Sequence, residues 1–291
     1  DYKNLKSFLK NQLIASVNFL IALTVKIVLA IYNNLVRITN YKIKEEYQMK
    51  SIFIKNKKAI LFDSGKVLNA PTTGNWFITP NFFKYINKEQ FQKLSHEKIH
   101  NAFSKAYKYI ESQSLISNRE EEYIHFKEYF KIMFENLEEL NVPIDTLECI
   151  AHDYVYSVNK YTFFEDVKTI IPKLHAHYSL AIVSDAWPSL ENIYIEAHLR
   201  KYFSSFIISS QIGVIKPHPL MYQKALQELG VHPNEAIFID DNISNCEGAI
   251  KLGIDAILLC RDKDWYLTHK QTNKIDVILG LDELAEILLE K

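Results

Sequence analysis

The sequence predicts an α/β protein: a doubly wound, Rossmann-like parallel sheet, an inserted α-helical cap domain and an N-terminal hydrophobic helix. Three observations predict this arrangement. From about residue 165 onward, short apolar runs alternate with helical segments, as in a parallel sheet covered on both faces. An earlier apolar run at 59–62 is separated from that part by a helical pattern over 80–160. The most apolar stretch, at 13–32, precedes them all.

The order of the elements follows from these patterns. Residues 59–62 are continuously apolar and are followed by the polar turn Asp63-Ser64-Gly65, which predicts a buried strand. Residues 80–160 are rich in Lys, Glu, Phe and Tyr at helical spacing and predict three or four helices. Beyond them we expect strands at 180–183, 206–208, 236–239 and 256–259, and helices at 166–177, 188–199, 217–229 and 244–252.

The chain therefore divides into three predicted parts. Residues 1–48 form a basic and apolar helical segment. Residues 49–75 and 162–291 form the α/β core, and residues 76–161 form the helical cap that interrupts it after the first strand. With 291 residues, the chain has room for two ordinary domains.

The composition excludes several classes of protein. Hydrophobic residues make up 48% and charged residues 24%, so a mostly disordered chain is excluded. The three cysteines lie far apart and form neither a disulfide framework nor a zinc pattern, which favours a reducing, cytoplasmic location. The net charge is −1, so we expect no nucleic-acid partner. Nothing in the sequence indicates an oligomeric state.

The N-terminal segment is both basic and apolar. Residues 1–60 hold eleven lysines and arginines against three acidic residues, and 13–32 are long enough to span a bilayer. Polar side chains fall on one narrow helical arc, at Asn11, Asn18, Lys26, Asn33 and Arg37. Three interpretations are open: a membrane anchor, a helix lying in the membrane interface, or a helix packed on the globular domain. Membrane association through residues 11–37, and hence a tethered location, is a hypothesis.

Polar residues suited to one reaction follow the predicted strands. Because the carboxyl ends of parallel strands meet at one edge of a sheet, we expect these side chains to lie together. Paired carboxylates repel each other unless a cation holds them, and their hard oxygens favour Mg²⁺. A lysine and a serine hydroxyl can bind phosphate oxygens, as phosphoryl transfer requires. The residues are Asp63, Ser184, Asp185, Lys216, Asp240 and Asp241.

With these residues the sequence resembles the haloacid dehalogenase superfamily of hydrolases, in subfamily I, which has a helical cap after its first motif. The resemblance covers about residues 57–260, and it matches the cap in position and helical character only. It rests on four motifs: Ala59-Ile-Leu-Phe-Asp-Ser-Gly-Lys-Val-Leu68, Ala181-Ile-Val-Ser-Asp185, Gly213-Val-Ile-Lys-Pro-His-Pro219 and Ile237-Phe-Ile-Asp-Asp-Asn242.

The resemblance implies a Mg²⁺-dependent phosphatase that acts on a small phosphate monoester. Asp63 would be the nucleophile that forms an aspartyl-phosphate. Ser184 would donate a hydrogen bond to the phosphate, and Lys216 would neutralise charge on the phosphate and on Asp63. Asp185 stands where relatives often have asparagine, and we assign it with Ser184 and Lys216 to substrate binding.

The resemblance also implies the metal site. Mg²⁺ would be held by Asp63, by the backbone carbonyl of Gly65 and by Asp241. Asp240 would be a further ligand or would lie beside the ion.

One position departs from the family pattern. Family phosphatases usually carry a second aspartate two residues after the nucleophile, which protonates the leaving group and then activates water. This chain has Gly65 there, and loss of such a group costs about 10²–10⁴-fold in rate. The substrate could have a good leaving group, another residue could supply the proton, or the protein could bind a phosphorylated ligand or protein partner with little turnover. Cleavage of C–halogen or C–P bonds is a further alternative.

The segment after the nucleophile leads into the cap. Residues 69–81 include Trp76, which we expect to lie over the site and to bind the substrate there. The alternative is a hinge whose aromatic side chains pack on the cap. A second hinge is expected near 160–164.

Overall fold

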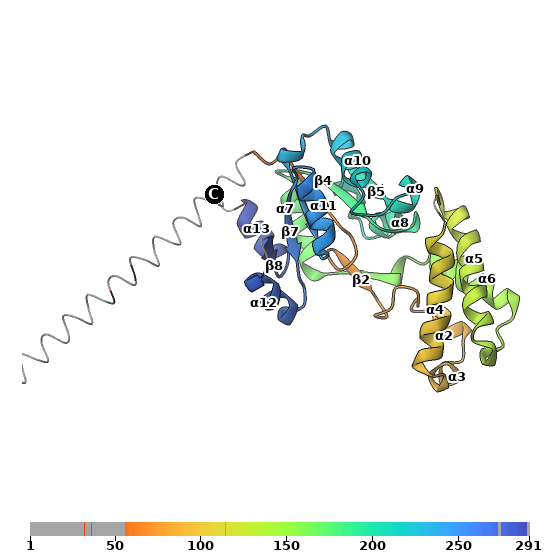
Figure 1. Ribbon diagram of the computed structural model, residues 1–291. Helices are drawn as coiled ribbons and strands as arrows, with labels where there is room; N and C mark the ends of the chain where they lie inside the picture. The colour runs from red at the N-terminus through yellow and green to blue at the C-terminus, as the bar shows by residue number, and fades with distance from the viewer. Residues whose placement is uncertain (1–31, 33–35, 37–55, 114, 273–274, 290–291) are drawn as a thin grey trace, which may run out of the picture. The chain divides into compact units, whose positions relative to one another are not determined.

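The computed structural model describes residues 32, 36, 56–113, 115–272 and 275–289 (Figure 1). The chain forms two compact units, residues 1–55 and 56–291. The hypothesis about residues 11–37 falls outside the described residues, apart from Tyr32 and Val36. Within the described part of the chain, no helix has both the length and the hydropathy to cross a membrane.

The second unit is built on a six-stranded sheet in which every neighbouring pair is parallel. The strand order is β5-β4-β1-β6-β7-β8. This confirms the predicted Rossmann-like sheet, and each strand expected from the pattern is present. The eighth strand was not predicted, because its three residues are too few to show a pattern. The bounds are β1 Ala59–Phe62, β4 Ser179–Ser184, β5 Ser205–Ile208, β6 Ala236–Asp240, β7 Asp255–Leu259 and β8 Asp276–Ile278.

Helices cover both faces of the sheet because its strands are apolar on both sides. On one face, alternate residues such as Leu61 and Phe238 pack in one apolar cluster with Met221 of α10 and Ala249 of α11. The opposite face is covered by α7 and α13, which also contact each other. The bounds of the core helices are α7 Glu165–His175, α8 Ser189–Glu196, α9 Ser209–Ile212, α10 Pro219–Leu229, α11 Ile243–Lys251, α12 Lys263–Thr272 and α13 Leu281–Leu289.

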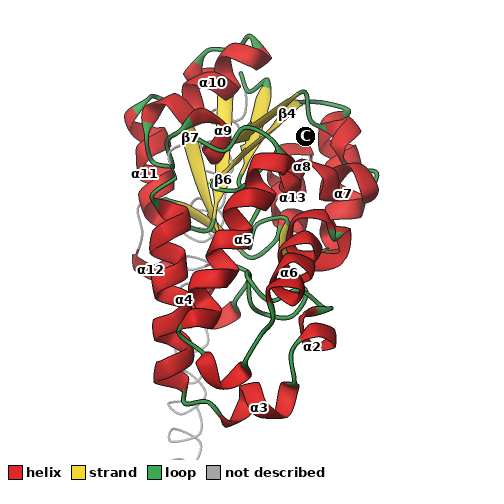
Figure 2. Ribbon diagram, turned by 90° about the vertical axis from the view of Figure 1, so that its right-hand side faces the viewer, coloured by secondary structure: helices red, strands yellow, loops and turns green. Residues whose placement is uncertain are grey.

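The cap is a separate helical cluster with an aromatic core. Of its three long helices, α5 packs against both α4 and α6 (Figure 2), and Phe126, Tyr129 and Phe130 are among the side chains buried in the cap. The sequence predicted three or four helices; the structure has these three and two short ones. The bounds are α2 Phe82–Tyr85, α3 Lys88–Lys93, α4 His96–Glu111, α5 Arg119–Glu135 and α6 Ile144–Tyr156.

Two short strands connect the cap to the core. β2 (Asn69–Pro71) leads into the cap and β3 (Tyr161–Phe163) leads out of it, and they pair in antiparallel fashion with Asn69 opposite Phe163 (Figure 1). The two predicted hinges therefore lie side by side in one ribbon. This ribbon starts just after the polar turn that follows β1, so it fixes where the cap enters relative to Asp63.

Candidate active site

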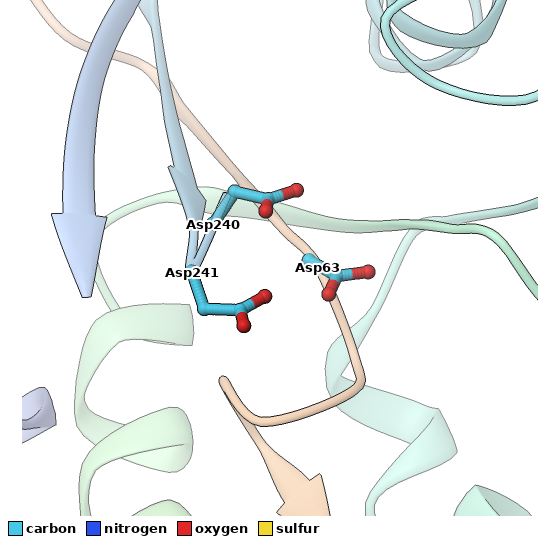
Figure 3. A group of neighbouring side chains, drawn as sticks. All are labelled: Asp63, Asp240 and Asp241. Atoms are coloured by element: carbon cyan, nitrogen blue, oxygen red, sulfur yellow. The ribbon is translucent and has the colours of Figure 1, made fainter. Parts of the chain in front are cut away.

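Three carboxylates meet at the carboxyl edge of the sheet. Asp63 directly follows β1, Asp240 ends β6 and Asp241 follows it. The two strands are neighbours, and the backbone N–H of Asp63 donates to the carbonyl of Ile239 at 2.9 Å. One carboxylate oxygen from each aspartate lies within 4.8 Å of the others (Figure 3). The register of two buried strands therefore gathers these side chains.

Lys216 is buried between two of these aspartates. Its Nζ donates to Asp63 Oδ1 at 2.7 Å and to Asp240 Oδ2 at 2.8 Å. Burial alone would lower the pKa of Lys216, but the nearby carboxylates of Asp63, Asp240 and Asp185 outweigh it and raise that pKa. The site thus holds a permanent cation against the predicted nucleophile.

Two contacts position the loop that carries Lys216. The backbone N–H of Lys216 donates to Asp185 Oδ1 at 2.9 Å, so Asp185 holds this loop at the end of β4. The next residue, Pro217, packs against Gly248 of α11. A Cβ at position 248 would lie 2.5 Å from the Cβ of Pro217, so only glycine allows this approach.

The two adjacent aspartates differ in their surroundings. Asp240 is fully buried, and its oxygens accept from Lys216, from the backbone N–H of Asn242 at 2.8 Å and from Asn245 Nδ2 at 3.1 Å. Asp241 is only partly buried and lines the cavity. Burial and the neighbouring Asp63 raise the pKa of Asp241, which a bound cation would oppose. Asp240 therefore anchors Lys216, while Asp241 faces the space where a ligand would bind.

The donor set fits a hard divalent cation. Asp63 and Asp241 offer carboxylate oxygens, the ligands that Mg²⁺ prefers. Gly65, the third predicted ligand, lines the same cavity. The exposed Nζ of Lys66 lies 3.5 Å from Asp241 Oδ2 and balances part of the negative charge.

A cavity of about 350 Å³ opens over these groups. Ser184, at the end of β4, lines it, and no described residue forms a hydrogen bond with its hydroxyl, which is left for a ligand. The core and the cap both contribute to the wall. The lining includes every residue that the sequence assigned to the site except Asp240: Asp63, Gly65, Trp76, Ser184, Asp185, Lys216 and Asp241.

Trp76 lies against the residue that departs from the family pattern. A Cβ added at Gly65 would stand 3.2 Å from Cη2 and 3.5 Å from Cζ2 of the indole. The ring also packs edge-on against Tyr161 of β3, with centroids 5.1 Å apart. Trp76 thus lies against the turn that follows Asp63.

Sequence reasoning missed several residues of the cavity wall. Tyr107 of α4 reaches the cavity because the cap packs there, and Trp187 lies in the loop that follows β4; no local pattern marks either residue. Asn69 lines the cavity too; its Nδ2 donates to Ser64 Oγ at 2.7 Å, and its buried Oδ1 has no partner among the described residues. Its signal was a polar residue directly after the first motif, which ends at Leu68.

A second buried lysine lies where the cap meets the core. Lys160 Nζ donates to the carbonyl of Tyr154 and to Ser189 Oγ, both at 2.8 Å. Ser189, at the start of α8, donates from its backbone N–H and its hydroxyl to the buried Glu122 of α5. Burial lowers the pKa of Lys160 to about 8 and raises the pKa of Glu122. This chain of hydrogen bonds ties two cap residues to the core.

The structure is a Rossmann-like α/β fold with an aspartate directly after a central strand and an inserted helical cap. A family model described as haloacid dehalogenase-like hydrolase matches residues 75–259, more than half of the chain. The protein belongs to that family. This confirms the resemblance drawn from the motifs.

Individual relatives include phosphatases and a dehalogenase. A glyceraldehyde 3-phosphate phosphatase from Pyrococcus furiosus is 31% identical over 141 residues, which cover 46% of this chain and 58% of the relative. An (S)-2-haloacid dehalogenase 2 from a Pseudomonas species is 26% identical over 153 residues, covering 51% of this chain and 64% of the relative. Each match thus spans less than two thirds of the relative's length.

Solved structures show the same fold. A phosphatase of the haloacid dehalogenase family from Thermococcus onnurineus superposes with a TM-score of 0.55 at 23% identity, covering 80% of this chain and 99% of that chain. At this identity the similarity concerns the fold.

Proposed function

We propose that this protein is a Mg²⁺-dependent phosphatase that hydrolyses a small phosphate monoester through an aspartyl-phosphate on Asp63. The observation that carries the proposal is the buried ion pair of Asp63 with Lys216, beside Asp241 and beneath a cavity. A nucleophilic carboxylate, a fixed cation and a hard-oxygen cluster are the groups that phosphoryl transfer requires. The phosphatases among the relatives support this choice.

The chain's own residues account for binding and attack. Lys216 engages Oδ1 of Asp63, which leaves Oδ2 to attack the phosphorus. Ser184 and Lys216 would hold the phosphate oxygens that carry the negative charge. Asp185 fixes the backbone of Lys216 and thereby the position of its ammonium group. Asp63 and Asp241, with the carbonyl of Gly65, would hold Mg²⁺, which when bound would offset the charge of the carboxylates and the phosphate.

The test is hydrolysis of 4-nitrophenyl phosphate by the full chain, with and without millimolar Mg²⁺, beside Asp63→Asn. We expect metal-dependent turnover that the substitution abolishes, with a thermal unfolding curve that shows the variant to be folded. Turnover unaffected by Asp63→Asn would contradict the assignment of the nucleophile.

Carbon–halogen cleavage is the second candidate, because Gly65 leaves the site without the usual acid and because a haloacid dehalogenase is among the relatives. It is distinguished by release of chloride from 2-chloropropionate without added metal. Chloride release together with no phosphate release would replace the proposed function.

A further inference from the structure

The contact between Gly65 and Trp76 limits which side chain can lie next to the predicted nucleophile. A side chain at position 65 would begin with a Cβ 3.2 Å from the indole, closer than ordinary van der Waals contact. The indole therefore lies against position 65. A side chain introduced there would require the ring to move by a few tenths of an ångström.

Trp76 is held in this place. The turn that carries it is fixed by a hydrogen bond from Gly74 N to the Pro71 carbonyl at 2.9 Å and by one from Phe77 N to Asn75 Oδ1 at 2.8 Å. Phe77, the next residue, stacks on Tyr129 in the cap core with centroids 5.0 Å apart. The tryptophan is thus fixed from both sides, by the ribbon and by the cap.

The cavity wall on the cap side is aromatic. In-line attack by Asp63 directs the leaving group away from the sheet, toward this wall. Among the described residues that line the cavity from the cap and its ribbon, none carries a carboxyl group. Tyr107 and Tyr161 are the phenolic groups of this wall, and burial raises the pKa of both, which makes them weaker proton donors. The aromatic lining consists of Trp76, Phe77, Tyr107, Tyr161 and Trp187.

We infer that Trp76 occupies the place of a proton donor beside Gly65, and that the substrate is an aryl phosphate monoester whose phenolate leaves unprotonated. The inference deepens the proposed function and rests on it. A phenolic oxygen has a pKa of about 10, far below that of an aliphatic alcohol, so it tolerates departure as an anion. Its ring can pack on the aromatic wall in offset or edge-to-face contact.

The reaction balances without a proton donor in the first step. The bond from Asp63 Oδ2 to phosphorus forms, the bond from phosphorus to the aryl oxygen breaks, and that oxygen keeps the electron pair. Water then attacks the phosphorus of the aspartyl-phosphate, which returns the Asp63 carboxylate and releases inorganic phosphate. The proton released in this second step neutralises the aryloxide.

The experiment measures kcat/KM of the full chain, with Mg²⁺, for phenyl phosphates with graded leaving-group pKa, for glycerol phosphate and for acetyl phosphate. We expect kcat/KM to fall steeply as the leaving-group pKa rises, and glycerol phosphate to react at least about 10²-fold more slowly than phenyl phosphate. We also expect a lower KM for phenyl phosphate than for acetyl phosphate, because only the former reaches the aromatic wall.

Matched variants separate the roles of the two positions. Trp76→Ala with Gly65→Asp should raise turnover of glycerol phosphate by about 10²-fold and flatten the dependence on leaving-group pKa. Gly65→Asp alone should give less, because the indole stays in place. Trp76→Ala alone should raise the KM for phenyl phosphate without any gain on glycerol phosphate. A thermal unfolding curve for each variant reports folding.

The outcomes separate the inference from the proposed function. If the unmodified chain hydrolyses glycerol phosphate and phenyl phosphate with similar kcat/KM, a proton donor is present and the inference fails while the phosphatase proposal stands. A lower KM for acetyl phosphate overturns the aryl assignment. If the unmodified chain hydrolyses no phosphate ester in the presence of Mg²⁺, the proposed function fails and the inference with it.

Discussion

Two buried lysines of this protein have the same exposure but pKa values that shift in opposite directions. Lys216 and Lys160 are each 4% exposed. Lys216 donates to two carboxylates, which raise its pKa, whereas Lys160 donates to a carbonyl and a hydroxyl, and its pKa falls to about 8. Burial disfavours the charged form of both. The partners therefore decide in which direction the pKa of a buried lysine shifts, and burial alone does not.

The difference in pKa between the two lysines agrees with where each of them lies. Lys216 lies at the edge of the sheet, where a permanent positive charge would bind phosphate. Lys160 lies between the cap and the core, where its charge is partly balanced by Glu122 through Ser189. We treat Lys216 as part of the reaction and Lys160 as part of the junction that holds the cap.

Replacing Lys216 should have the largest effect on turnover. Lys216→Met removes the cation from Asp63 and from the phosphate, and we expect kcat for 4-nitrophenyl phosphate to fall by about 10³-fold. The matched control is Lys160→Met. Lys160 donates to Tyr154 and Ser189 and not to Asp63 or Ser184, so this substitution should change kcat by less than about tenfold. Equal losses in the two variants would mean that the junction, and not the charge, controls the site.

Replacing Lys160 should have the largest effect on stability. Lys160→Met removes the stronger of the two positive charges that act on the buried Glu122, and we expect the free energy of unfolding to fall by about 3 kcal/mol, measured by urea denaturation. Combining it with Glu122→Gln should cost less than the two single substitutions added together. Additive losses would show that the two groups are not coupled through Ser189.

Lys160 should also make the stability of the protein depend on pH. Its pKa is about 8 in the folded protein and 10.5 as the ordinary value, so between these limits the unfolded chain binds the proton that the folded one lacks. Stability of the unmodified protein relative to Lys160→Met should therefore rise with pH across this window, by at most about 1.4 kcal/mol per pH unit. A difference independent of pH would place the folded pKa near its ordinary value.

An exposed lysine should contribute least to the free energy of unfolding. Lys66 has a side chain that is 68% exposed, and its Nζ lies 3.5 Å from Asp241. Ion pairs in this setting contribute little, so Lys66→Ala should change the free energy of unfolding by no more than about 0.5 kcal/mol in the same denaturation experiment. A larger loss would give this pair a structural role that its exposure does not suggest.

Local sequence was enough for the part of the site at the edge of the sheet. A buried parallel strand must end where its apolar run ends, and all such ends lie at one edge of the sheet. The positions of Asp63, Ser184, Lys216 and Asp241 at that edge therefore follow from the apolar runs before them and from the motifs that they complete. The parallel sheet followed in the same way, from strands that are apolar on both faces.

The cap-facing wall of the cavity could not be derived in this way. Tyr107 and Trp187 come from a cap helix and from a loop, and they share a wall with Trp76 only because the cap packs over the sheet. The sequence predicted Trp76 near the site, but it did not show that the indole lies against Gly65. For this reason Gly65→Asp alone, which looks sufficient from the sequence, needs Trp76→Ala beside it.

The sequence by itself determined the fold class, the polar residues that follow the strands, and the family. These depend on periodicity and short-range motifs. The tertiary structure alone decided the partners: which carboxylates hold Lys216, which groups lower the pKa of Lys160, and which ring lies against Gly65. Those contacts join residues far apart in the chain. Their energies depend on distance and on the exclusion of water, and local sequence determines neither.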